Sequence, residues 1–238
     1  MKRDFLFSCY QTPRGKLLQE AEAQYLQRSI TVSCQQTLLQ IGGLGWESDF
    51  IDGELYKNYT ILDAKKLGYC TLRKIQGKAY CLPLKCDSVD MIIVPHLLEF
   101  DEYRFQTMRE IERVLKPEGL LIIINFNPWS LWVRYQYLWD KKLADSWNAH
   151  FIARSRVLDW LKLLNFEVIS ASDFMLDNTK HSHGKSISRN CALSANAYAI
   201  KAIKRRYNLI PLTPVKNFAQ SLAIANAAAF TQNEQHDE

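Results

Sequence analysis

"VDMIIVPHLLEFDEYRFQTMREIERVLKPEGLLIIINF", residues 89–126, has the pattern of two strands joined by a helix. Its two ends, 89–95 and 120–126, are strand-length runs that are apolar on both faces, which is typical of a parallel sheet covered on both sides. The segment between them has a helical period and is stopped by Pro117 and Gly119. Because parallel strands need a crossover connection, this stretch predicts a strand, a helix and a second, parallel strand.

The same alternation extends in both directions along the chain. Further strand-length runs stand at 37–42, 59–64 and 166–172, and "RSRVLDWLKLLN" (154–165) has a helical period before the last of them. We interpret all of these runs as buried strands of one parallel sheet. Strands that alternate with helices imply right-handed crossovers, so the sequence predicts an α/β fold with a doubly wound sheet and helices on both faces. A final run, "AYAIKAIKRRY" (197–207), alternates polar and apolar residues and favours a strand near the sheet edge.

The two ends of the chain differ from this alternating part. "TPRGKLLQEAEAQYLQRSI" (12–30) has helical spacing with Thr12 as a candidate N-cap, and it predicts an amphipathic helix laid over the core. We divide the chain into an N-terminal helical segment (1–35), an α/β domain (36–207) and a C-terminal extension (208–238). The extension is rich in Ala, Asn and Gln, which predicts a helix that frays into a disordered tail.

Composition and charge narrow the class of protein. The 238 residues are 47% hydrophobic and 23% charged, which suits one packed core and argues against disorder or a fibre. The net charge of +5 is scattered, and its tightest basic cluster, 204–206, is interpreted as a solvated strand end. No apolar run is long enough to span a bilayer, and the first fifteen residues lack the apolar stretch of a leader. We expect a cytoplasmic protein that binds neither membrane nor nucleic acid.

Metal ligands are not expected from the sequence. The chain has six cysteines: Cys9, Cys34, Cys70, Cys81, Cys86 and Cys191. None belongs to a Cys-x-x-Cys pair or another metal-ligand spacing, so we interpret them as reduced, mostly buried thiols. His181 and His183 stand two apart in a polar loop, without further ligands nearby in the sequence.

A glycine-bearing turn follows the run at 37–42. In an open α/β sheet, ligands bind beyond the carboxyl ends of the strands. Gly42, Gly43 and Gly45 let the backbone approach a ligand there, and the amides of the next helix would face a polar group. Asp63 ends the second run 18 residues after Gly45, near the offset at which an acidic side chain reaches ribose hydroxyls. These features predict a site for an adenosine-type ligand, and the alternative is a tight structural turn with a solvent-facing Asp63.

A longer signature lies between residues 80 and 132. Its parts are Leu82-Pro83-Leu84, the stretch from Asp87 to Asp90, the segment from His96 to Glu99, Arg109-Glu110-Ile111 and the segment from Arg113 to Gly119. In this pattern the chain resembles the class I S-adenosylmethionine-dependent methyltransferases, specifically the small type 11 group. The resemblance covers residues 36–203 when the flanking strands are included. It implies seven strands, the last one antiparallel and inserted between the fifth and sixth, with S-adenosylmethionine as cofactor at the carboxyl ends of the first two.

The resemblance also assigns cofactor roles to individual residues. Gly42 would be the first glycine of the cofactor turn, and Asp63 the carboxylate that binds ribose. Ala79 and Tyr80 would lie beside adenine. Pro95 would lie near the methionine end of the cofactor. The full expected cofactor set is Gln40, Gly42, Gly43, Gly45, Asp63, Ala79, Tyr80 and Pro95.

Four positions depart from the family pattern. The family's turn reads Asp-x-Gly-x-Gly-x-Gly, whereas Gln40 stands here at the acidic position and Leu44 and Trp46 at the second and third glycines. Lys78 stands where an acidic residue commonly lies near adenine. Gln40 can hydrogen-bond near the cofactor's amino-acid group, but a carboxylate would attract its ammonium more strongly. Either the neighbouring glycines provide the close approach in a shifted turn, or the pocket is narrowed.

Methyl transfer from a sulfonium is a displacement on an activated carbon, so the protein must align the reacting groups, exclude water and remove a proton where needed. His96 is the candidate base because its ordinary pKa of about 6.5 lies near neutrality, and the alternative is a structural or capping histidine. Asn127 and Trp129 are candidate substrate contacts. They begin an aromatic segment that also holds Trp132, Tyr135 and Trp139. Its aromatic side chains either form a wall over the cofactor or pack the following helix on the sheet.

Three hypotheses for the function follow. The first is methyl transfer from S-adenosylmethionine to a small molecule. The second, motivated by Leu44, Trp46 and Lys78, is a non-catalytic protein of this fold that binds a partner or another nucleotide. The third is an RNA methyltransferase or RNA-binding module, which rests only on the mild basicity and the basic cluster from Lys204 to Arg206. The apolar patch of the first helix would either cover the cofactor site or form a homodimer surface.

Overall fold

The structure is a computed structural model, and it describes residues 4–30, 36–51, 58–64, 73–143, 150–175 and 195–206. The chain divides into the units Met1–Arg206 and Tyr207–Glu238, and every described residue belongs to the first. The predicted C-terminal extension and the histidine pair of the polar loop lie outside the described residues, as does the side chain of Trp139.

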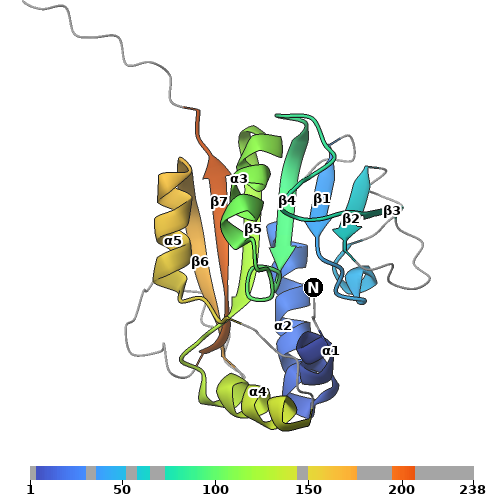
Figure 1. The fold of residues 1–238 in the computed structure, drawn as a ribbon, viewed down its shortest axis with the longest axis vertical. Helices are drawn as coiled ribbons and strands as arrows, with labels where there is room; N and C mark the ends of the chain where they lie inside the picture. Colours follow the sequence, from blue (N-terminus) through green and yellow to red (C-terminus); the bar gives the residue numbers. More distant parts are fainter. Residues whose placement is uncertain are drawn as a thin grey trace, which may run out of the picture. The chain divides into compact units, whose positions relative to one another are not determined.

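Seven strands form one sheet in the order β3-β2-β1-β4-β5-β7-β6 (Figure 1). They are β1 (Leu38–Ile41), β2 (Tyr59–Asp63), β3 (Arg73–Gln76), β4 (Val89–Pro95), β5 (Leu115–Phe126), β6 (Phe166–Met175) and β7 (Ala195–Lys204). The pairs β1–β2, β1–β4, β2–β3 and β4–β5 are parallel, while β7 runs antiparallel to both β5 and β6. This confirms the α/β fold and the inserted antiparallel strand that the resemblance implied.

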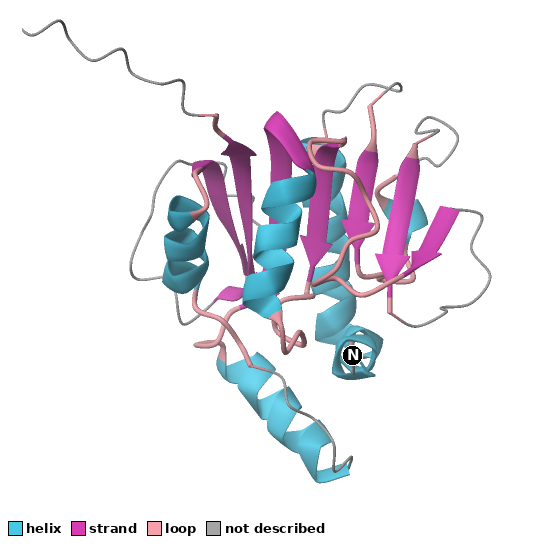
Figure 2. Ribbon diagram, turned by 45° about the horizontal axis from the view of Figure 1, so that its top comes forward, coloured by secondary structure: helices cyan, strands magenta, loops and turns pink. Residues whose placement is uncertain are grey.

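Helices cover both faces of the sheet (Figure 2). The helices are α1 (Asp4–Gln11), α2 (Pro13–Ser29), α3 (Arg104–Val114), α4 (Leu131–Leu143) and α5 (Arg154–Leu163), with a 3-10 turn η1 (Glu47–Asp49). Successive strand residues point to opposite faces, so each strand contributes to two cores. Met91 and Ile93 pack in the core beneath α1 and α2, whereas Ile92 and Val94 pack in the core beneath α3 and α5.

The N-terminal part contains two helices where the sequence analysis predicted one. The predicted helix is α2, and its predicted cap is confirmed: the side-chain oxygen of Thr12 accepts a hydrogen bond from the amide of Gly15 at 3.0 Å. The additional helix, α1, buries Phe5, Leu6 and Tyr10. Because apolar residues recur in it after one helical turn, its spacing contained a usable signal.

The final strand, β7, lies next to the edge strand, between β5 and β6, as the resemblance implied. Its residues 195–200 are all buried, although its sequence alternates polar and apolar residues. β6, interpreted as a buried strand, forms the edge and exposes Val168 and Ile169. Both faces of β7 are covered, and small alanines pack there. Because alanine is only weakly apolar, the sequence of β7 contains no continuous apolar run that would indicate a buried strand. Its lysines place their ammonium groups on backbone carbonyl oxygens, such as that of Ser29 for Lys201 at 3.0 Å.

The connection after β1 also differs from expectation. A doubly wound sheet predicts an α-helix after the glycine turn, but the described part of this connection, 42–51 and 58, has only the 3-10 turn η1. β3 is four residues long and mostly exposed, so it had no apolar run by which it could be recognised.

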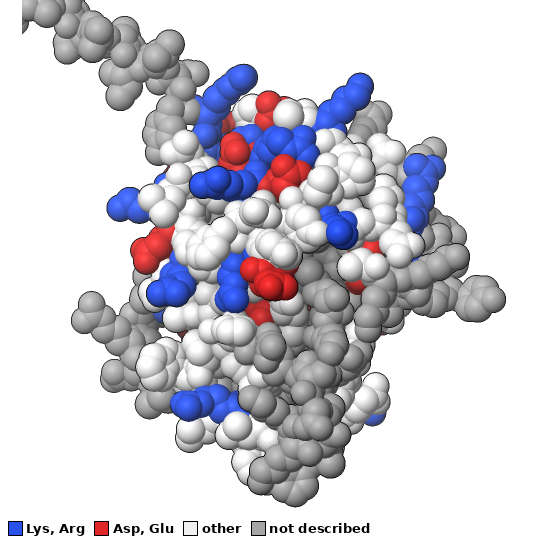
Figure 3. Space-filling model, viewed as in Figure 1, with Lys and Arg blue, Asp and Glu red and all other residues white. Residues whose placement is uncertain are grey.

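Surface charges and thiols complete the description of the fold. Lys204 pairs with Asp87 and Glu112 at 3.0 and 3.2 Å, and Arg205 pairs with Glu167 at 2.6 Å. On the face shown in Figure 3, Lys and Arg side chains are likewise interspersed with Asp and Glu. The thiols of Cys81 and Cys86 are exposed and only that of Cys9 is buried, so the expectation of mostly buried cysteines is wrong for the three that the structure describes. Within those same residues, no helix is long and apolar enough to cross a membrane.

Candidate functional site

The carboxyl ends of the parallel strands lie along one edge of the sheet and bring distant polar residues together. Gly42 follows β1, Asp63 ends β2, His96 follows β4 and Asn127 follows β5. The ends of β1 and β2 are joined directly, because the amide of Gly42 donates to the backbone oxygen of Leu62, the residue before Asp63, at 2.7 Å. The candidate residues from four separate stretches of sequence therefore share one edge.

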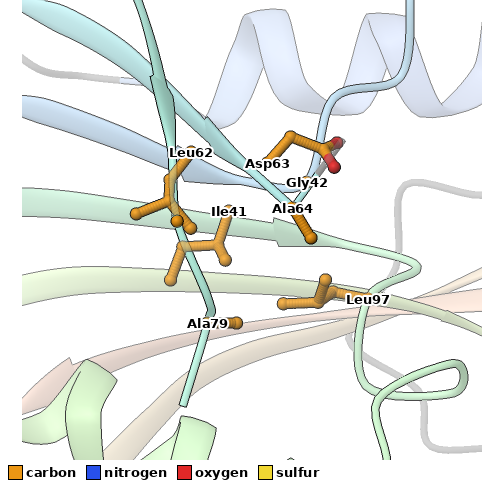
Figure 4. Close-up of a pocket in the computed structure, with 8 residues that line it drawn as sticks. Ile41, Gly42, Leu62, Asp63, Ala64, Ala79 and Leu97 are labelled. Atoms are coloured by element: carbon orange, nitrogen blue, oxygen red, sulfur yellow. The ribbon is translucent and has the colours of Figure 1, made fainter. Parts of the chain in front are cut away.

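A small cavity opens at this edge beside β1 and β2 (Figure 4). It is lined by Ile41, Gly42, Leu62, Asp63, Ala64, Gly77, Ala79 and Leu97. The view in Figure 4 shows the carboxylate of Asp63 beside Gly42, and the apolar side chains of Ala79 and Leu97 further along the cavity. A flat apolar ring suits the apolar walls, and hydroxyl donors suit the carboxylate.

Asp63 is held in place by contacts on both sides. One carboxylate oxygen accepts the amide of Gly43 at 2.8 Å, and its backbone oxygen accepts the amide of Gly77 at 3.0 Å. The carboxylate therefore ties the end of β2 to the glycine turn while it lines the cavity.

The glycine turn keeps its two required glycines and turns its bulky residues away. Gly42 and Gly45 have φ of 96° and 89°, a region that favours glycine. Leu44 and Trp46 are buried in the core beneath α1 and α2, where Trp46 packs edge-on against Tyr10. Neither bulky side chain is among the residues that line the cavity.

The turn wraps around an acidic side chain of its own. The carboxylate of Glu47 is buried, with 3% of the residue exposed, and accepts the amides of Leu44 and Gly45 at 2.5 and 3.0 Å. The side-chain amide of Gln40 donates to the same carboxylate at 3.1 Å, and its oxygen accepts the hydroxyl of Tyr59. Sequence reasoning missed Glu47. The one available signal was an acid directly after a turn whose usual acidic position holds Gln40.

A buried polar cluster surrounds His96 at the same edge. Tyr10 from α1 donates to one oxygen of Glu22 from α2 at 2.5 Å, and the other oxygen lies 3.1 Å from Nε2 of His96. Glu99 places a carboxylate oxygen 3.5 Å from Nδ1 of His96 and accepts the amide of Phe126 with its other oxygen. Sequence reasoning missed Tyr10 and Glu22, because nothing local relates α1 and α2 to a residue 74 positions later.

The two carboxylates change the acid–base behaviour of this cluster. Burial alone would lower the pKa of His96, but Glu22 and Glu99 outweigh it and raise that pKa to about 9. Burial also raises the pKa of Glu99, and burial together with the charge of Glu22 raises that of Tyr10. At neutral pH the imidazole therefore carries two protons and donates to Glu22. The expectation of a neutral histidine base near pH 7 does not suit this environment.

The backbone of His96 is also unusual. Its φ is 45°, which costs a non-glycine residue about 1–2 kcal/mol, and its amide donates to the oxygen of Ile124 at 2.7 Å. Strained residues of this kind cluster at functional sites, so the position merits a functional hypothesis.

The remaining candidates are placed around this edge without lining the cavity. Tyr80 is half-buried against the ring of Tyr103, and the ammonium of Lys78 lies 5.5 Å from the Tyr80 ring centroid. Pro95 is buried at the end of β4. No cluster of potential metal ligands occurs among the described side chains.

The segment after β5 divides into a structural part and an exposed part. The side chain of Asn127 donates to the oxygen of Ala195 at 2.9 Å and accepts the amide of Trp129 at 3.1 Å, so it shapes the turn into α4. Trp129 and Tyr135 are 57% and 65% exposed. The predicted aromatic wall is therefore split: these two face solvent, while Trp132 packs against the core.

Comparisons with known proteins agree with this geometry. A family model described as a methyltransferase domain matches residues 52–123, which include the strand ends at Asp63 and His96. The uncharacterized protein YafS of Escherichia coli strain K12 is 31% identical over 223 residues, covering 92% of this chain and 89% of YafS.

Solved structures share the fold. A SAM-dependent methyltransferase from Archaeoglobus fulgidus superposes with a TM-score of 0.61 at 20% identity, over 85% of this chain and 100% of that one. An S-adenosylmethionine-dependent methyltransferase from Mesorhizobium loti does so with a TM-score of 0.57 at 14% identity, over 77% and 97%. With its strand order, its cavity and its family match, the chain belongs to the class I S-adenosylmethionine-dependent methyltransferases.

Proposed function

We propose that this protein transfers a methyl group from S-adenosylmethionine, the cofactor of its family, to a small-molecule acceptor that reaches the edge beside His96. The observation that carries the proposal is the cavity at the carboxyl ends of β1 and β2, with the Asp63 carboxylate and the apolar surface of Ala79 in its lining. The bound cofactor would supply the activated methyl carbon. The chain's residues have to bind, orient and desolvate the reacting groups.

The residues of the cavity fit the adenosine half of the cofactor. Ile41, Ala79 and Leu97 offer apolar surface for the base, and Asp63 offers carboxylate oxygens for ribose hydroxyls. Gly42 has no side chain, so its backbone can lie close to the ligand.

The amino-acid half of the cofactor meets groups that are already engaged. The amides of Leu44 and Gly45 are bonded to Glu47, and the amide of Gln40 is bonded to Glu47 and to the oxygen of Gly42 at 2.8 Å. Binding of the amino-acid half therefore depends on whether Glu47 keeps these hydrogen bonds or releases them when the ligand binds.

The cluster at His96 is proposed to handle a proton of the acceptor. One oxygen of Glu22 accepts from Tyr10 and the other lies 3.1 Å from Nε2 of His96, so the three side chains hold the imidazole in a fixed orientation. Trp129, exposed after β5, is proposed to contact the acceptor, whereas Asn127 positions the turn that presents it.

Calorimetric titration with S-adenosylmethionine and S-adenosylhomocysteine tests the proposal. We expect binding with a stoichiometry near one. Asp63→Ala should weaken both affinities at least tenfold, because a hydrogen bond to a charged group contributes about 1.5–3 kcal/mol. Asp49→Ala is the matched control, since Asp49 is an exposed acid of the neighbouring 3-10 turn. Absence of heat and of thermal stabilisation with both ligands would refute the proposal.

The comparisons do not support the second hypothesis, a non-catalytic binding protein. The RNA hypothesis rested on the basic cluster at 204–206, in which Lys204 and Arg205 are paired with acidic residues. If RNA were the acceptor, binding should be tight at low salt and fall steeply as salt rises.

A further inference from the structure

Glu47 places a negative charge inside the glycine turn. Its carboxylate accepts three hydrogen bonds, from the amides of Leu44 and Gly45 at 2.5 and 3.0 Å and from the side chain of Gln40 at 3.1 Å. With 3% of the residue exposed, it is shielded from water. Charge-assisted bonds of this kind are the stronger ones, so the carboxylate is firmly held.

Successive backbone amides in a tight turn form a concavity that binds anions. In this turn the anion belongs to the chain, because Glu47 already satisfies two of the amides. The carboxylate also lies close to the ligand cavity: the amide nitrogen of Gln40 that donates to Glu47 donates as well to the oxygen of Gly42 at 2.8 Å, and Gly42 lines the cavity.

We propose that Glu47 takes the place of a ligand carboxylate at this turn, so that the site prefers adenosyl ligands whose tail carries an ammonium without a carboxylate. This inference rests on the proposed adenosine site. A ligand carboxylate has to displace Glu47 from three donors or lie beside it, and like charges at short range repel. A ligand ammonium gains a nearby partner. Glu47 is thus a specificity-determining residue for the tail of the ligand.

Four adenosyl ligands separate the effects of the tail. S-adenosylmethionine and its decarboxylated form differ only by the carboxylate, S-adenosylhomocysteine carries the full amino-acid tail on a neutral sulfur, and 5′-methylthioadenosine has no charged tail. We expect the wild-type chain to bind the decarboxylated form about tenfold more tightly than S-adenosylmethionine, a modest effect for two carboxylates at close range. Calorimetry on the full chain measures this ratio.

Glu47→Gln should reduce the ratio by about fivefold or more, because an amide keeps one acceptor oxygen but removes the charge. Affinity for 5′-methylthioadenosine should stay unchanged. Asp49→Asn is the matched control, because it removes the same charge from the exposed end of the same 3-10 turn and should leave the ratio unchanged.

The outcomes separate this inference from the proposed function. If the wild-type chain binds S-adenosylmethionine as tightly as the decarboxylated form, the inference is overturned, even though the adenosine site stands. If Glu47→Gln and Asp49→Asn shifted the ratio equally, the inference would also be overturned, because the effect would then come from long-range charge and not from the position of Glu47. If none of the four ligands binds, both proposals fail. The affinities of the wild-type chain for the two ligands test the inference even if Glu47→Gln does not fold.

Discussion

At the scale of single residues, Gln40 and Glu47 show how one substitution depends on another. Sequence reasoning treats Gln40 as a loss, because the family's acid would attract the cofactor's ammonium. In the structure the amide of Gln40 donates to Glu47 at 3.1 Å, which a carboxylate at position 40 could not do. Gln40 therefore stabilises the buried carboxylate of Glu47 by donating a hydrogen bond to it.

This relation predicts the effect of restoring the acid. Gln40→Glu should lower the free energy of unfolding by about 3 kcal/mol, because it buries two adjacent carboxylates without compensation. Adding Glu47→Gln should recover part of that loss, since one amide again faces one carboxylate. Urea denaturation of the wild type, both single variants and the double variant measures the coupling. Strictly additive effects would show that the two side chains do not interact.

At the scale of elements, the corner between α1 and α2 positions the side chains that contact His96. Thr12 donates its hydroxyl to the oxygen of Cys9 at 2.7 Å and caps α2 through Gly15. A Cβ added at Gly15 would lie 1.9 Å from that same oxygen of Cys9. The two helices can therefore meet closely only with glycine at this position, and their contact brings Tyr10 to Glu22.

The close contact at this corner predicts that replacing a helical glycine by alanine, usually a stabilising substitution, destabilises this protein. Gly15→Ala should lower the free energy of unfolding by about 2 kcal/mol through overpacking, although alanine in an open helix position stabilises by about 0.5–1 kcal/mol relative to glycine. Gln24→Ala, at an exposed position of α2, is the control and should change stability little. Chemical denaturation distinguishes the two signs, and an unchanged or raised stability in Gly15→Ala would contradict the close contact.

At the scale of the whole molecule, the cluster of Tyr10, Glu22, His96 and Glu99 joins α1, α2 and β4 inside the fold. The pKa of His96 is raised from 6.5 to about 9 in the folded chain, so the folded state binds this proton more tightly than the unfolded state. The resulting stabilisation is fully present below the unfolded pKa and is lost as the pH rises through the folded one. The raised pKa of Glu99 acts in the same direction.

Stability should therefore fall as the pH rises from about 6.5 to about 9, by at most about 3 kcal/mol for His96 at 1.36 kcal/mol per pKa unit. Urea denaturation at a series of pH values measures this slope. His96→Gln should flatten it, whereas His150→Gln, a change at an exposed histidine, should keep the wild-type slope. A wild-type stability that is flat across this window would mean that His96 is not a buried imidazolium.

The sequence by itself determined the alternation of strands and helices, because the period of apolar residues records which faces of each element are covered. It also determined, through the family resemblance, the strand order and the residues Gly42, Asp63 and Ala79 that line the cavity. These properties depend on neighbours in the chain or on motifs of fixed spacing.

Only the tertiary structure decided the rest. It seated Glu47 on the amides of its own turn and brought Tyr10 and Glu22 to His96. It also raised the pKa of His96 to about 9. The reason is physical: the pKa of a buried group is set by the groups that surround it in space. Two of those around His96, Tyr10 and Glu22, come from the N-terminal helices, which no local pattern connects to it.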